Sequence, residues 1–233
     1  MTTAAPAAQR YFGTPISTVG RLMLAEMVGT FSLIFFGCGA IMVDARDGGL
    51  GVLGIAVAFG LVIAVMIATF GHISGAHFNP AVTLALSARK VISATLIAPY
   101  LVAQLVGATA AALTLRASLG GIGNLGATTP SGSLGQAFLW ETVMTAVLVA
   151  VVLAVATDRR AEGHPVALIV GGTIALCALA GGPVTGASMN PTRTLAPVFA
   201  GGPSDGLWVY LTAPFLGAAI AVALFAAFRT EES

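Results

Sequence analysis

Six long apolar stretches dominate the hydrophobic pattern of the chain, and short polar or glycine-rich segments separate them. They cover residues 20–43, 50–70, 91–115, 135–157, 164–182 and 206–228. Each is close to the roughly 20 residues that an α-helix needs to cross the hydrocarbon core of a bilayer. The pattern therefore predicts an all-α membrane protein with six transmembrane helices.

Two shorter apolar runs each begin with the dipeptide Asn-Pro. Residues 75–85 and 186–196 around these dipeptides are identical at seven of eleven positions. Asn followed by Pro is typical of a helix start, with Asn as the N-cap and Pro at the first helical position. Segments 79–88 and 190–200 would form only about 15 Å of helix each, roughly half of the hydrocarbon thickness. We therefore predict two half-helices.

The two halves of the chain repeat each other. The first apolar stretch resembles the fourth in its order of Leu, Glu, Val and Thr. The third resembles the sixth over residues 100–108 and 210–218, two segments that both begin with Tyr-Leu. This similarity predicts a first repeat over residues 20–116 and a second over 135–230. The segment 117–134 between them is rich in Gly, Ser and Thr and is expected to be a connecting loop.

Each repeat contains three full spans, so the second repeat must begin on the opposite side of the membrane from the first. The two three-helix repeats are therefore predicted to be inverted, with their half-helices entering from opposite faces and meeting near the midplane. Non-helical backbone is tolerated at that depth only where it is buried or lines a watery cavity. We expect such a cavity between the repeats.

Composition and charge agree with a membrane protein. With 57% hydrophobic and 8% charged residues, the chain cannot cover a water-exposed surface. Residues 1–19 lack the apolar core of a signal peptide and are interpreted as a cytoplasmic N-terminal tail. With this tail inside, seven basic residues fall on the cytoplasmic side and two on the other, which predicts a multi-pass protein of the plasma or inner membrane with both termini in the cytoplasm. The seven are Arg10, Arg21, Arg89, Lys90, Arg159, Arg160 and Arg229, and the two are Arg46 and Arg116.

No motif in the sequence indicates catalysis. Cys38 and Cys177 lie within apolar stretches, at a spacing that suggests neither a metal site nor a disulfide. Motifs for nucleotide binding or a nucleophile are not found either. The chain is therefore predicted not to be an enzyme and to have no cofactor, metal or nucleic-acid partner.

Glu26 and Glu141 lie inside the first and fourth spans, where an unpaired carboxylate is costly. Two interpretations remain open: the pair couples transport to protons, or each carboxylate accepts hydrogen bonds from the irregular backbone before a half-helix. The second is favoured, because each repeat supplies one Glu and one such segment. His72 and His77, near the first half-helix, are either pH gates or structural hydrogen-bonding groups, and the structural role is favoured.

Arg193 lies inside the second half-helix, where the first half-helix has Val82. A permanently charged guanidinium beside a midplane cavity would repel cations and donate hydrogen bonds to a passing solute. The alternative is an ion pair with a carboxylate. Since no acidic residue is close in sequence, a pore-lining role is favoured.

Together these motifs resemble those of the aquaporin and glycerol-facilitator (major intrinsic protein) family. The resemblance rests on Ala-Glu-x-x-Gly-Thr at 25–30, on residues 71–83 and on Met-Asn-Pro-Thr-Arg at 189–193, and it extends over nearly the whole chain. It implies a right-handed bundle of six helices plus two half-helices, a homotetramer with one pore per subunit, and passive flow of water or small uncharged solutes. The pore motifs that it implies are Asn79-Pro80-Ala81 and Asn190-Pro191-Thr192, in the second of which Thr replaces Ala.

By position, the same resemblance places a narrow selectivity filter at Phe59, Ala178, Ala187 and Arg193. Water-selective members resemble one another in having His where this chain has Ala178, and glycerol facilitators typically have Asp where it has Thr194. A filter with a single aromatic ring is expected to be wider and less polar than one that passes water in single file.

We therefore predict a passive channel in the lipid bilayer for water and small uncharged solutes, such as glycerol, urea or neutral metalloid acids, that excludes protons and ions. The alternative is an ion-coupled secondary transporter that uses Glu26 and Glu141, since carriers also contain inverted repeats and broken helices. A third possibility is a closed, junction-like structural membrane protein. Flux linear in the osmotic gradient favours the channel, and saturable flux driven by a pH gradient favours the carrier.

Overall fold

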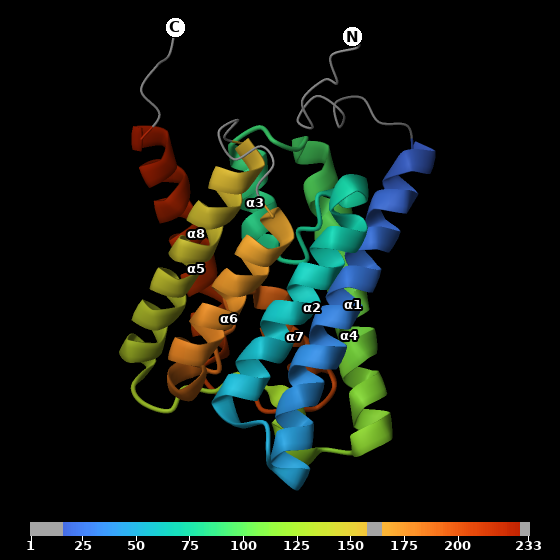
Figure 1. Cartoon of the computed structure of the whole chain (residues 1–233), viewed down its shortest axis with the longest axis vertical. Helices are drawn as coiled ribbons and strands as arrows, with labels where there is room; N and C mark the ends of the chain where they lie inside the picture. Colours follow the sequence, from blue (N-terminus) through green and yellow to red (C-terminus); the bar gives the residue numbers. More distant parts are fainter. Residues whose placement is uncertain (1–15, 158–164, 229–233) are drawn as a thin grey trace, which may run out of the picture.

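The computed structural model describes residues 16–157 and 165–228, which form six long helices around two short ones (Figure 1). The prediction of six spanning helices and two half-helices is confirmed. In the first half the helices are α1 (Ile16–Asp47), α2 (Gly51–Ser74), the half-helix α3 (Pro80–Ala88) and α4 (Ile97–Leu119). In the second half they are α5 (Leu134–Thr157), α6 (Val166–Thr185), the half-helix α7 (Pro191–Phe199) and α8 (Leu207–Phe228). Short 3-10 turns occupy Ala94–Leu96 and Ile122–Gly126.

Some boundaries differ from those expected from hydropathy. Helix α1 begins at Ile16, inside the segment 1–19 interpreted as a tail, and α4 extends to Leu119, inside the expected connecting loop. Both extensions contain polar residues, Ser17 and Thr18 in the first and Ser118 in the second, which lower the local hydropathy but which a helix tolerates at its ends. Residues 1–15 and the predicted polar turn at 158–163 lie outside the described residues.

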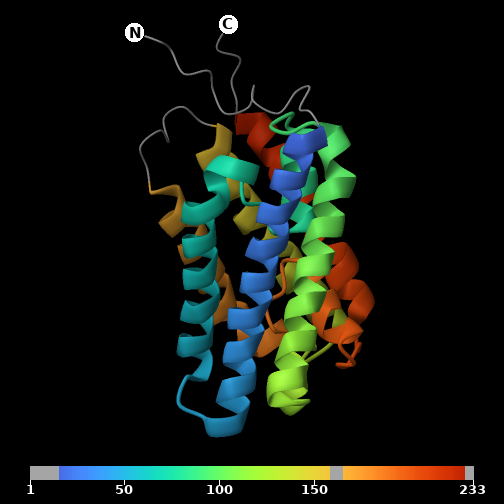
Figure 2. The ribbon, with the colours of Figure 1, turned by 90° about the vertical axis from the view of Figure 1, so that its right-hand side faces the viewer.

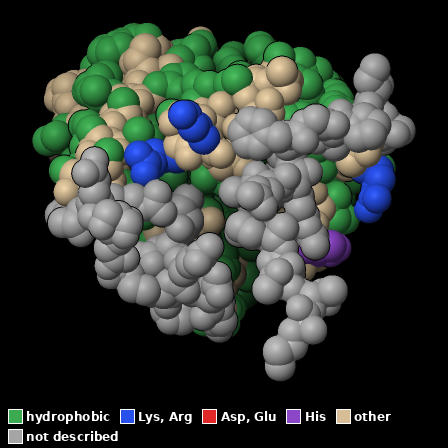
Figure 3. All heavy atoms as spheres, turned by 90° about the horizontal axis from the view of Figure 1, so that it is seen from above, with side chains coloured by type: hydrophobic (Ala, Val, Ile, Leu, Met, Phe, Trp, Pro, Cys, Tyr) green, Lys and Arg blue, Asp and Glu red, His purple; other side chains and the backbone are tan. Residues whose placement is uncertain are grey.

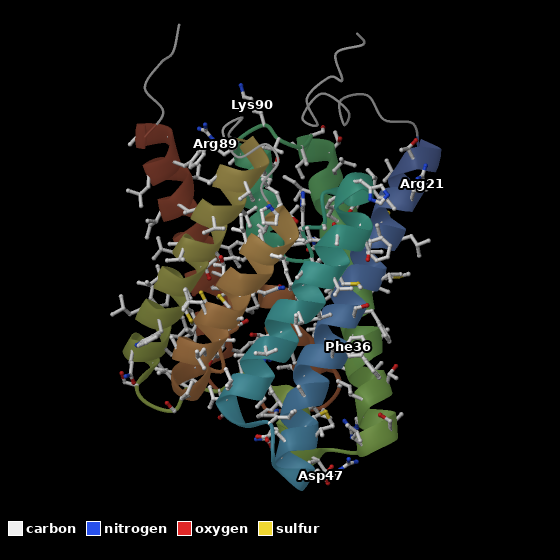
Figure 4. All side chains as sticks on the ribbon, viewed as in Figure 1. Arg21, Phe36, Asp47, Arg89 and Lys90 are labelled. Atoms are coloured by element: carbon white, nitrogen blue, oxygen red, sulfur yellow. The ribbon has the colours of Figure 1, made fainter. Side chains whose placement is uncertain are left out.

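The outer surface of the bundle is apolar. Each of the six long helices is long and hydrophobic enough to cross a bilayer. Large apolar side chains point outward along them, including Phe36, which is 58% exposed and is labelled part-way along α1 in Figure 4. An exposed apolar surface of this extent requires an apolar surrounding. The chain is a multi-pass membrane protein.

The helices pair in the same way in both halves. Helix α1 packs against α4, and the corresponding α5 packs against α8, while α2 and α6 pack against each other and join the halves (Figures 1 and 2). The half-helices α3 and α7 lie in opposite halves of the bundle height (Figure 1). This arrangement is the inverted pair of repeats predicted from the odd number of spans.

Glycines bring the paired helices into backbone contact. A Cβ atom on Gly107 of α4 would lie 2.1 Å from the carbonyl oxygen of Met27 on α1. At the corresponding place, a Cβ on Gly217 of α8 would lie 2.3 Å from the carbonyl oxygen of Thr142 on α5. The small residues therefore allow the close approach that their spacing predicts.

Between the halves the contact is reciprocal. A Cβ on Gly60 of α2 would lie 2.7 Å from the carbonyl oxygen of Gly171 on α6, and a Cβ on Gly171 would lie 2.5 Å from the carbonyl oxygen of Gly60. The two repeats thus meet backbone to backbone at this crossing.

Charged side chains gather at the two ends of the bundle. Arg21, Arg89 and Lys90 lie at the end where α1 begins and α8 ends, and Asp47 lies at the opposite end (Figure 4). Seen from above, the first of these faces carries blue Lys and Arg side chains among apolar ones (Figure 3). Arg10, Arg159, Arg160 and Arg229 lie outside the described residues.

The substitution Gly171→Ala is expected to lower the melting temperature of the purified protein in detergent. The new Cβ would meet a backbone oxygen of α2, which cannot move away unless the two helices separate. Overpacking of this kind costs about 1–3 kcal/mol. The neighbouring Gly172→Ala is the matched control, because a Cβ there meets no described atom within 4 Å. Equal melting temperatures for the two variants would contradict the proposed role of the contact.

Candidate functional site

The two half-helices begin at the centre of the bundle with side-chain caps. The Oδ1 atom of Asn79 accepts a hydrogen bond from the backbone N–H of Ala81 at 2.9 Å. The Oδ1 atom of Asn190 accepts from the N–H groups of Thr192 at 3.1 Å and Arg193 at 3.4 Å. Each Asn therefore satisfies free donors at the first turn of its own helix, as an N-cap does.

The same two side chains also tie the half-helices to each other. The Nδ2 atom of Asn79 donates to the carbonyl oxygen of Met189, and the Nδ2 atom of Asn190 donates to the carbonyl oxygen of Phe78, both at 2.8 Å. Each amide group thus bonds to the residue that precedes the other Asn. Because an Asn amide carries two N–H groups, each side chain keeps one further donor.

The segments before the half-helices have an unusual backbone. Helix α2 ends at Ser74, its C-cap Gly75 has a φ of 85°, and Ala76 and Phe78 follow with φ of 53° and 51°. In the second repeat, Ala187 and Met189 have φ of 45° and 53°. Non-glycine residues rarely adopt this left-handed region, and each costs on the order of 1–3 kcal/mol. These two lead-in segments therefore need strong partners.

Glu26 is the partner in the first repeat. Its Oε1 atom accepts from the hydroxyl of Ser74 at 2.7 Å and from the N–H of His77 at 2.9 Å. Its Oε2 atom accepts from the N–H of Phe78 and from Nε2 of Gln104, both at 2.8 Å. Four donors surround this buried carboxylate, which holds the first lead-in segment against α1.

Glu141 makes the corresponding contacts in the second repeat. Its Oε1 atom accepts from the hydroxyl of Thr185 at 2.7 Å and from the N–H of Ser188 at 2.9 Å, and its Oε2 atom accepts from the N–H of Met189 at 2.7 Å. All three groups are donors. This is the geometry that a structural acceptor for irregular backbone requires.

Further supporting residues were not assigned to the site from sequence. The hydroxyl groups of Ser74 and Thr185 accept from the N–H groups of Ala76 and Ala187 while donating to the carboxylates. The hydroxyl groups of two tyrosines donate to the carbonyl oxygens of the same residues: Tyr100 to Ser74 at 2.8 Å and Tyr210 to Thr185 at 2.7 Å. A hydroxyl residue and a tyrosine recur at corresponding positions of the two repeats, and this recurrence in the sequence could have identified them as supporting residues.

A cavity passes the two Asn caps at the centre of the bundle. Asn79 and Asn190 line it, and so do all four positions predicted for the filter, which come from α2, α6, the second lead-in segment and α7. Most of the remaining lining is aliphatic, including Leu33, Ile63, Val152 and Val170. The cavity therefore presents a few polar groups within an apolar wall.

Arg193 is 2% exposed and lies against the cavity. Its Nη1 atom donates to the carbonyl oxygen of Gly126 at 2.6 Å, and its guanidinium carbon lies 5.3 Å from the ring centroid of Phe59. Its Nε and Nη2 atoms have no hydrogen-bond partner among the described residues. Within the same residues no salt bridge involves Arg193, so its charge lies beside the cavity without a carboxylate partner.

The other predicted residues occupy different places. His77 lines the cavity, with Nδ1 3.2 Å from the Thr83 hydroxyl. His72 is instead exposed on α2 and is not part of the lining, because it lies outside the face of α2 whose residues Phe59, Ile63 and Ile67 line the cavity. Among the motif residues, Pro80, Ala81, Pro191 and Thr192 are buried in the first turns of the half-helices and do not line the cavity.

Comparison with known proteins places these features in context. The sequence model of the family described as "Major intrinsic protein" matches residues 16–225. Aquaporin NIP1-2 from Oryza sativa subsp. japonica is 47% identical over 205 residues, which cover 84% of this chain and 67% of the relative. Nodulin-26 from Glycine max is 44% identical over 198 residues, which cover 84% of this chain and 73% of the relative.

A solved structure is also similar. The X-ray structure of the aquaglyceroporin from Plasmodium falciparum superimposes with a TM-score of 0.80 at 28% sequence identity. The match covers 90% of this chain and 96% of that one.

The substitution Glu141→Gln is expected to destabilise the protein and to lower its water permeability in liposomes. One carboxylate oxygen becomes an NH2 group that faces only donors, and a buried unsatisfied donor costs about 1–3 kcal/mol. The neighbouring Thr142→Val is the control, because it removes a buried hydroxyl that has no partner among the described residues. A Glu141→Gln protein with unchanged melting temperature that loses only pH-driven flux would instead support the carrier.

Proposed function

The chain belongs to the major intrinsic protein family, and on that premise we propose how its pore selects what it conducts. The protein is a passive membrane channel for water and small solutes. The observation that carries the proposal is the single cavity that brings together both Asn caps and the four predicted filter residues. Phe59, Ala178, Ala187 and Arg193 form the selectivity filter.

The width of this filter decides which solutes pass. Two of its four members are alanines, and Phe59 supplies its only ring. Such a filter leaves room for molecules larger than water. We infer that glycerol, urea and undissociated metalloid acids pass together with water.

The polarity of the cavity suits uncharged hydrogen-bonding molecules. Arg193, which lines the cavity, and one further N–H on each Asn replace part of a solute's hydration shell, while the aliphatic wall offers no such contacts to an ion. A bare ion would therefore lose most of its hydration on entry. Neutral solutes lose less and are favoured.

Protons and cations are excluded by positive charge. The guanidinium of Arg193 and the N-termini of α3 and α7, each equivalent to roughly half an elementary charge, act on the central part of the cavity. A water molecule that accepts from both Asn79 and Asn190 is oriented so that its neighbours on the two sides point away from it. This orientation interrupts a chain of hydrogen bonds that would relay protons.

The ion-coupled carrier is less well supported. It would need Glu26 and Glu141 to exchange protons or ions with the cavity, but neither lines it, and both accept hydrogen bonds from surrounding donors. A closed, junction-like role is also less well supported, since a cavity passes the centre of the bundle.

We further propose the orientation, location and assembly of the channel. The end that carries Arg21, Arg89 and Lys90 faces the cytoplasm, by the positive-inside rule. Both termini are then cytoplasmic, in the plasma or inner membrane. The family resemblance supports a homotetramer with one pore in each subunit.

The substitution Ala178→His is expected to narrow the filter. In stopped-flow measurements on proteoliposomes, the unmodified protein should conduct water in proportion to the osmotic gradient and should also conduct glycerol or urea. Ala178→His should keep water flux and reduce solute flux by about tenfold, because each added 1.4 kcal/mol of barrier is a factor of ten. Ala178→Ser is the control, which adds polarity without a ring and should keep solute flux. Unmodified protein that conducts water but no solute above empty liposomes would refute the wide filter.

The substitution Arg193→Val copies the residue found at the corresponding position of the first repeat. Removing the charge should allow protons or cations to leak, while water permeability stays within about twofold because the neutral path is preserved. A pH-sensitive dye inside the liposomes and electrical recordings from planar bilayers would measure the leak. If neither rises above that of the unmodified protein, the charge of Arg193 is not what excludes ions.

A further inference from the structure

The aromatic ring of Phe59 rests against a glycine on the neighbouring helix. A Cβ atom on Gly37 of α1 would lie 2.2 Å from Cε1 of Phe59 and 2.6 Å from both Cδ1 and Cζ. No residue with a side chain leaves room for the ring at this place. Gly37 itself does not line the cavity.

The opposite side of the ring belongs to the pore. Phe59 lines the cavity, and the guanidinium carbon of Arg193 lies 5.3 Å from its ring centroid. The ring is therefore held between α1 and Arg193. Any side chain at position 37 would push it away from α1.

The second repeat has a different pair of residues at the corresponding positions. Glu26 of α1 corresponds to Glu141 of α5, and by the same offset Gly37 corresponds to Val152. On α2 and α6, Ser74 corresponds to Thr185, and likewise Phe59 corresponds to Val170. Both valines line the cavity.

The first repeat therefore pairs a glycine, Gly37, with a large aromatic side chain, whereas the second repeat has two valines of intermediate size at the corresponding positions. The ring can be part of a filter in the first half only because the glycine accepts it. The paired change makes the two ends of the cavity different while the helix framework stays the same.

We propose that Gly37 is a positioning residue that determines solute selectivity. By leaving space for the ring of Phe59 against α1, it sets the width of the filter. This inference rests on the proposed function, in which Phe59 is the filter's only aromatic member.

A side chain at position 37 has a predictable direction of effect. Nonbonded carbon atoms rest about 3.5–4.0 Å apart, so the ring would have to move by at least about 1 Å. Helix α1 occupies the side from which the ring is pushed, and the empty space lies on the side of the cavity. The ring therefore moves into the pore and narrows it.

The test compares Gly37→Ala with Gly39→Ala in proteoliposomes. Gly39 lies on the same helix, but a Cβ there would lie 3.3 Å from the end of a flexible side chain, Cδ2 of Leu115. Gly37→Ala should lower the ratio of glycerol to water permeability by about tenfold. Gly39→Ala should leave the ratio unchanged.

The same comparison in a Phe59→Val background separates positioning from general packing. Without the ring, Gly37→Ala should no longer change the ratio. An equal effect with and without the ring, or an unchanged ratio in the single variant, would overturn the inference.

Glycerol conduction by the unmodified protein distinguishes a failure of the proposed function from a failure of this inference. If the unmodified protein conducts no glycerol, the wide filter is refuted, and the inference is then tested on water permeability alone. That permeability should fall in Gly37→Ala and recover when Phe59→Val is added, and the absence of recovery would overturn the inference. An electron cryo-microscopy map of Gly37→Ala should also show the ring displaced toward Arg193, and a ring at its original place would count against it.

Discussion

Irregular backbone inside a bilayer must find its hydrogen-bond partners within the protein, and the rest of this structure depends on that constraint. Two segments interrupt the helices at the centre of the bundle, and both contain residues with positive φ. Glu26 and Glu141 each accept two backbone N–H groups from one of these segments. Without these carboxylates, the half-helices could not begin at the midplane, because their lead-in segments would expose unpaired donors.

Burying two carboxylates is unfavourable, but here each gains several hydrogen bonds. The resulting framework is nearly the same in both repeats, down to the hydroxyl groups of Ser74 and Thr185. A pair of asparagines then joins the two frameworks through hydrogen bonds that cross between the half-helices. The centre of the molecule is thus held by polar contacts, whereas its outer surface is apolar.

In the proposed channel, selectivity depends on positions at which the repeats differ. The framework residues recur, but the lining changes from Val82 to Arg193 and from Phe59 to Val170 between corresponding positions. Since the helix pairs and the crossing glycines are common to both halves, such changes alter the cavity without altering the fold. This separation would allow a symmetric scaffold to hold the proposed filter at only one level of the pore.

The sequence by itself determined the six spans through hydropathy and the two half-helices through their Asn-Pro caps, because both are local properties of the chain. The inversion of the repeats then followed from the odd number of spans in each repeat. It also indicated the two Asn caps and the four expected filter positions that line the cavity, whereas the other motif residues are buried in the first turns of the half-helices and His72 is exposed. Only the tertiary structure decided which atoms meet: the carbonyl oxygen of Gly126 at Arg193, the tyrosines at the lead-in segments, and the ring of Phe59 against Gly37. These contacts join residues far apart in sequence, and their geometry is fixed by how closely the helices pack, which no local pattern specifies.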